Sequence, residues 1–103
     1  MMTIKTIEEK IAEVKTTLAE TRKITDDYEE LNSQAWKKVL KMENNLVKYT
    51  VEECEKIYDE YEEINNKYHS FDSEVEILEE MIDKLEDLKE LTEHLEWLKE
   101  QRA

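Results

Sequence analysis

The chain of 103 residues contains neither glycine nor proline. Glycine supplies the left-handed backbone conformations of hairpin turns and phosphate-binding loops, and proline supplies rigid turns between elements. A chain that lacks both has few means of joining strands or building such loops. The absence therefore predicts an all-α protein with no strands, and it excludes most families of enzymes.

Cysteine and long apolar runs are also scarce. The single cysteine, Cys54, excludes an internal disulfide and is typical of a reducing compartment. No apolar run approaches the roughly 20 residues of a membrane span, and residues 1–10 carry charges throughout. We therefore expect a cytoplasmic protein without a membrane span.

Charge is abundant and unevenly distributed. Charged residues make up 42% of the chain and hydrophobic residues 39%, which is too apolar for a disordered acidic tail. The net charge of −13 comes from the C-terminal half, because residues 1–50 hold nine acidic and nine basic residues, whereas residues 51–103 hold 19 and six. This asymmetry predicts either two surfaces with different neighbours or a solvated face that maintains solubility.

Apolar residues recur at alternating spacings of three and four, which is the repeat of a coiled-coil seam. The first run comprises Ile4, Ile7, Ile11, Val14, Leu18, Tyr28, Ala35, Val39, Met42 and Leu46, with polar Thr21 and Thr25 in its middle. The second run comprises Val47, Cys54, Ile57, Tyr61, Ile64, Tyr68, Phe71, Val75, Leu78, Ile82 and Leu85. A slip then puts Leu85, Leu88, Leu91, Leu95 and Leu98 on a last stripe. Such slips locally unwind a supercoil or mark a change of packing partner.

Start and stop signals predict three helices, at about 6–23, 26–68 and 73–101. Thr6 with Glu9, and Ser73 with Glu76, have the spacing of capping boxes. These signals predict bends near residues 24 and 70.

The predicted fold is a single helical domain over residues 1–103, either an antiparallel helical hairpin or a three-helix coiled-coil bundle. Asn44 and Asn45 offer a further bend, which would give a more even bundle. Because the seam keeps its register through 23–25 and 69–73, the sequence also allows a continuous helix at either point.

Few residues are candidates for catalysis or metal binding. His94 lies four residues after Glu90, but a di-iron bundle needs a carboxylate three residues before the histidine, where Leu91 stands. Cys54 lies on the seam, where a small buried apolar role is expected rather than a nucleophile. We expect no catalytic residue, no metal site and no cofactor, and hence no enzymatic activity.

The first functional interpretation is a non-enzymatic acidic coiled-coil protein that binds another protein, or its own copies, through helix faces. It would act as an adaptor or assembly subunit. The predicted contacts are the seam residues Tyr61, Ile64, Tyr68, Leu78, Ile82 and Leu85.

The alternative interpretation depends on nine carboxylates that recur at helical spacing. They are Glu52, Glu55, Asp59, Glu62, Glu76, Glu80, Asp83, Asp87 and Glu90. A rigid row of negative charge resembles the field of a phosphate backbone. The row therefore predicts a nucleic-acid mimic that blocks the basic groove of a DNA- or RNA-binding protein, as a phage anti-defence protein would. Direct contact with nucleic acid is not expected, and an ordinary solvated coiled-coil exterior has the same pattern.

Overall fold

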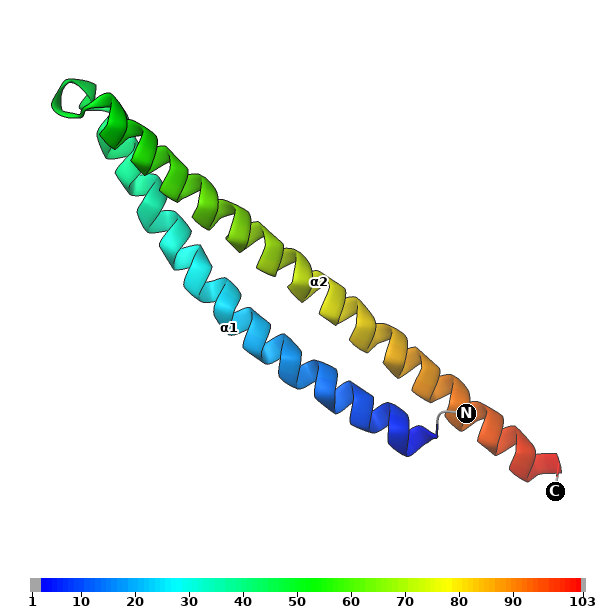
Figure 1. Ribbon diagram of the computed structural model, residues 1–103. Coiled ribbons are helices and arrows are strands. Elements are labelled where there is room, and N and C mark those ends of the chain that lie inside the picture. The colour runs from blue at the N-terminus through cyan, green and yellow to red at the C-terminus, as the bar shows by residue number, and fades with distance from the viewer. Residues whose placement is uncertain (1–2, 103) are drawn as a thin grey trace. The chain divides into compact units, whose positions relative to one another are not determined.

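The computed structural model describes residues 3–102, and its elements are helices (Figure 1). They are the long helices α1 (Ile4–Glu43) and α2 (Val51–Arg102), joined through a short 3-10 helix, η1 (Leu46–Lys48). No strand occurs in residues 3–102, so the all-α prediction is confirmed. Neither long helix contains, within that range, a segment apolar enough over a sufficient length to cross a membrane.

Contacts divide the chain into two compact units. Unit 1 contains the chain up to Glu20 and from Glu74 onward, and unit 2 is Thr21–Ser73. In each unit a segment of α1 lies beside a segment of α2 that runs in the opposite direction (Figure 1). The hairpin is therefore the predicted arrangement that is found, and the three-helix bundle is not observed.

The predicted breaks at 23–25 and 69–73 are wrong, because the α-helix is continuous at both positions. In place of the three helices expected at 6–23, 26–68 and 73–101, the structure has the two long helices α1 and α2. Ser73 and Glu76, with the spacing of a capping box, lie inside α2. The continuous helix left open by the unbroken seam is the arrangement that occurs.

Packing explains this continuity. Thr25 is buried on the seam, and its hydroxyl donates a hydrogen bond to the Thr21 carbonyl at 2.8 Å, so the polar group is satisfied inside the helix. Phe71, in the stretch expected to be a loop, stacks on Tyr28 with ring centroids 5.3 Å apart. Both predicted breaks therefore lie where the helices of unit 2 pack together.

The helix starts differ from the predicted ones. Helix α1 begins at Ile4, where the Thr6 amide donates a hydrogen bond to the Thr3 hydroxyl oxygen at 3.2 Å. Helix α2 begins with a capping box that the sequence analysis missed. The Glu53 amide donates to the Thr50 hydroxyl oxygen at 3.1 Å, and the Glu53 carboxylate accepts from the Thr50 amide at 3.5 Å.

The turn between the helices occupies residues 44–50, at the asparagine pair that offered a bend. It is made without glycine, and no residue in 3–102 has a positive φ. The Asn45 amide donates to the Met42 carbonyl at 3.0 Å, and the Lys48 amide donates to the Asn45 carbonyl at 2.9 Å. The Asn45 side chain also donates to the Lys41 carbonyl at 3.0 Å. Short-range bonds of the 3-10 type thus replace the left-handed residue of a usual turn.

The seam residues of α1 form most of the buried core. The buried apolar residues are Ile7, Val14, Leu18, Ala35, Val39, Met42 and Ile82. In unit 1, Val14, Leu18 and Ile82 form one cluster, against which Val75, Leu78 and Leu85 pack. Leu46 and Val47 are exceptions to the predicted seam, with exposures of 58% and 102%, because they lie in the turn.

The two helical segments of unit 2 also meet through aromatic and polar groups outside the buried core. Trp36 packs on Tyr61 with ring centroids 5.3 Å apart. The Oδ1 atom of Asn32 is buried and has no hydrogen-bond partner among the described residues. A lone polar group in a helix interface lowers stability but favours one register of pairing, so Asn32 can align the two helices of this unit.

Candidate protein-binding site

The six predicted seam contacts lie against the chain's own α1. In unit 2, Tyr61, Ile64 and Tyr68 are half-buried. In unit 1, Leu78 and Leu85 are half-buried beside Ile82, which is 8% exposed. These side chains therefore stabilise the protein itself, and their use by a partner stays a prediction.

A second row on α2 in unit 1 consists of large apolar side chains that are mostly exposed, interrupted by charged Lys84 and ending at half-buried Leu98. We call it the second stripe, and its members are Ile77, Met81, Lys84, Leu88, Leu91, Leu95 and Leu98, at alternating spacings of four and three. The exposures are 57% at Ile77, 39% at Met81, 38% at Leu88, 54% at Leu91 and 49% at Leu95. An exposed row of apolar side chains on a helix is a candidate interaction surface.

Sequence periodicity indicates only part of the second stripe. After a slip it puts Leu85, Leu88, Leu91, Leu95 and Leu98 on a last stripe, and it leaves out Ile77 and Met81. In the structure the face beyond Leu85 that lies toward α1 continues through Lys89 and Thr92, both half-buried. The spacing of four and three from Ile77 onward was the signal that could have identified the complete stripe.

An apolar groove runs beside the second stripe in unit 1. Its volume is about 570 Å³. On the N-terminal side the groove is lined by Thr3, just before α1, and Ile7 in α1. From α2 the lining residues are Leu88, Leu91, Thr92, Leu95, Glu96 and Lys99. Ile7 forms the buried floor of the groove, and Thr3 and the residues of α2 form its accessible walls.

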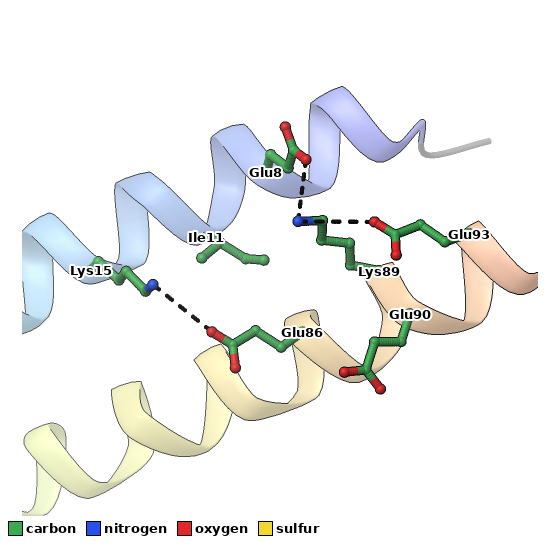
Figure 2. A pocket seen from close by; sticks show the side chains of 7 residues that line it. All are labelled: Glu8, Ile11, Lys15, Glu86, Lys89, Glu90 and Glu93. Atoms are coloured by element: carbon green, nitrogen blue, oxygen red, sulfur yellow. Dashed lines mark ion pairs between the residues drawn. The ribbon is translucent and has the colours of Figure 1, made fainter.

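Another groove of unit 1, of about 380 Å³, is lined mainly by charged side chains (Figure 2). The Nζ atom of Lys89 lies 3.2 Å from a Glu8 carboxylate oxygen and 4.0 Å from one of Glu93. The Nζ atom of Lys15 lies 3.9 Å from a Glu86 oxygen. These pairs are largely exposed, so each adds little stability, but together they favour this alignment of the two segments. They lie on the side of α2 that carries Lys89 and not on the second stripe.

The nine carboxylates of the predicted acidic row are all exposed. Four lie in unit 2 (Glu52, Glu55, Asp59 and Glu62) and five in unit 1 (Glu76, Glu80, Asp83, Asp87 and Glu90). None of them pairs with a lysine or arginine within residues 3–102. Glu90 borders the charged groove but points away from α1 (Figure 2). The row is thus placed where a partner could reach it.

Two tyrosines of unit 2 have raised pKa values. The Tyr58 hydroxyl donates a hydrogen bond of 2.8 Å to the Glu43 carboxylate, and this bond raises the pKa of Tyr58 above its ordinary value of 10.0. Partial burial and then the charges of Glu29, Asp72 and Asp26 raise the pKa of Tyr68.

We expect Glu43→Gln to lower the pKa of Tyr58 toward 10.0, because the substitution removes the charged acceptor. A raised pKa means that the protonated phenol is favoured in the folded protein. The contact therefore contributes fully below pH 10.0 and is lost as the pH rises through the folded pKa. An NMR titration of the Tyr58 ring, with Glu60→Gln as the control, measures the shift. An identical pKa in wild type and Glu43→Gln would contradict the assigned bond.

The two residues considered for metal binding and nucleophilic catalysis, His94 and Cys54, lie in surroundings of a different kind. His94 stacks on Trp97 with ring centroids 6.0 Å apart, and Cys54 is a half-buried free thiol. Within residues 3–102 no three histidine, cysteine, aspartate or glutamate side chains are placed to hold a metal ion. Comparison of the chain with models of protein families, with curated proteins and with solved structures finds no match.

Proposed function

We propose that this protein is a non-enzymatic acidic coiled-coil protein that acts by binding another protein through a helix face, as an adaptor or assembly subunit. The observation that supports the proposal is the second stripe, which stays exposed after α2 has paired with α1 in unit 1. The binding surface would be this stripe, beside the half-buried seam.

The proposal is tested by capture of proteins on the immobilised chain, with elution in steps from about 0.05 to 1 M salt, since salt screens charge attraction but not apolar contacts. We expect a partner that stays bound through the gradient and is lost when Leu88 and Leu95 are both changed to aspartate. Both side chains are partly exposed, so the variant should fold. Val47→Asp, in the exposed turn, is the matched control and should bind normally. Equal binding by the double variant would contradict the proposal.

A second candidate function is nucleic-acid mimicry, which is supported by the exposure of the nine unpaired carboxylates. In this case a basic nucleic-acid-binding protein would elute early in the same salt gradient, and duplex DNA would compete for it. Changing Glu80, Asp83 and Asp87 to lysine would abolish its capture. If the triple variant still captures the basic protein, mimicry is excluded as the mode of binding.

A further inference from the structure

We propose that the second stripe of unit 1 binds an amphipathic helix of another protein that carries lysine or arginine beside its apolar residues. The inference rests on the proposed function and specifies the chemistry of its partner. The bound helix would pack along the exposed face of the α2 segment of unit 1, in the manner of a coiled coil.

The spacing of the second stripe determines that the occupant is a helix. The stripe repeats at four and three from Ile77 to Leu98, and a heptad repeat of this kind packs its side chains between those of another helix. The apolar groove adds exposed Thr3, next to the start of α1, to the leucines of α2, so the occupant also reaches the N-terminal end of the α1 segment. Lys84 is the one charged member of the stripe, and a single charge at such a position favours one register of the bound helix.

The surrounding charge determines which kind of helix fits. Glu80 lies three residues after Ile77, and Asp87 lies four residues before Leu91, so both carboxylates lie next to the stripe on the helix surface. Both are exposed and neither is paired within residues 3–102. Glu96 and Lys99, at the end of the groove, balance one another. The edge of the stripe is therefore negative and complementary to a cationic helix.

The same charge disfavours a second copy of this chain. Two second stripes packed together would bring Glu80 and Asp87 of both copies to one interface, and residues 51–103 would add their excess of negative charge from each side. Like charges brought together at an interface select against that pairing. A partner of opposite charge meets no such repulsion.

The test uses three synthetic peptides of about three heptads, titrated into the full chain by calorimetry at about 0.15 M salt. The first has leucine at the two apolar heptad positions and lysine or arginine at the flanking ones. The second has glutamate at those flanking positions. The third has the composition of the first with the leucines scrambled, so it keeps the charge and loses the stripe.

We expect the cationic heptad peptide to bind at least about tenfold more tightly than either of the others, a difference of roughly 1.4 kcal/mol. Leu91→Asp should weaken it by a similar factor, and Val47→Asp should not, because Leu91 belongs to the stripe and Val47 lies in the turn. Circular dichroism of each variant establishes that it is folded, and Leu91→Ser, which adds no charge, should also weaken binding.

Each of the following results would overturn the inference. Equal binding of the scrambled peptide would mean that charge alone attracts it, and equal binding by folded Leu91→Asp and Leu91→Ser would mean that the stripe is not the site. Dimers in sedimentation that dissociate on Leu91→Asp would identify a second copy as the occupant.

If the cationic peptide does not bind while the Leu88 and Leu95 double variant still loses a captured protein, the inference fails and the proposed function stands. If that double variant captures proteins as wild type does, the proposed function itself fails.

Discussion

Replacement of Ile82 by aspartate is expected to separate the two helical segments of unit 1. Ile82 is 8% exposed and packs with Val14 and Leu18, so the substitution removes an apolar side chain and puts a carboxylate in its place. A buried charge without a partner, added to lost apolar contact, costs about 4 kcal/mol or more, which is a large part of the stability of a small protein. Hydrogen exchange over residues 4–20 and 74–102 measures the loss.

The matched control is Ile77→Asp, the same chemical change five residues earlier in α2. Ile77 is 57% exposed, so its aspartate stays in water and the substitution should cost less than about 1 kcal/mol. If the two variants exchange at the same rates, Ile82 does not belong to the core of unit 1. The comparison also separates the seam from the second stripe, because only the seam is required for pairing within the chain.

Replacement of Met42 by alanine is expected to destabilise unit 2 by about 2–5 kcal/mol. Met42 has an exposure of 0% in the last turn of α1, beside the residues that reverse the chain, and alanine leaves a cavity there. The greater helix propensity of alanine offsets only a few tenths of a kcal/mol. The midpoint of urea unfolding, followed by circular dichroism, measures the effect.

Leu46→Ala provides the comparison for this prediction. Leu46 is 58% exposed in η1, four residues after Met42, so its truncation should change the free energy of unfolding by less than about 1 kcal/mol. Equal costs at the two positions would show that the end of α1 is not packed as described. An unchanged midpoint in Met42→Ala alone would have the same meaning.

The sequence by itself determined the class of the fold and most of its inward face. Without glycine or proline the chain has no usual turn residue, and the repeat of three and four selects one face of each helix. From Ile7 to Met42 the predicted seam includes every buried apolar residue of α1. Sequence also indicated the acidic row, because exposed positions at helical spacing follow from the same periodicity.

The tertiary structure decided where the helices end. A capping box changes stability by only about 1 kcal/mol, so the signals near Thr6 and Ser73 could not outweigh the packing of an unbroken seam. Phe71 shows this, because its stacking on Tyr28 keeps the predicted loop helical. The turn at residues 44–50 uses backbone bonds of the 3-10 type, which no sequence motif announces.

The tertiary structure also decided which face of α2 is free. Residues 75–98 contain two overlapping heptad patterns, one through Ile82 and one through Leu91, and periodicity alone favours neither. Packing against Val14 and Leu18 buries Ile82 and half-buries its neighbours in the first pattern, and the ion pair between Glu8 and Lys89 lies on the same side of α2. One helix can cover only one face of another, and so the second pattern remains exposed to solvent.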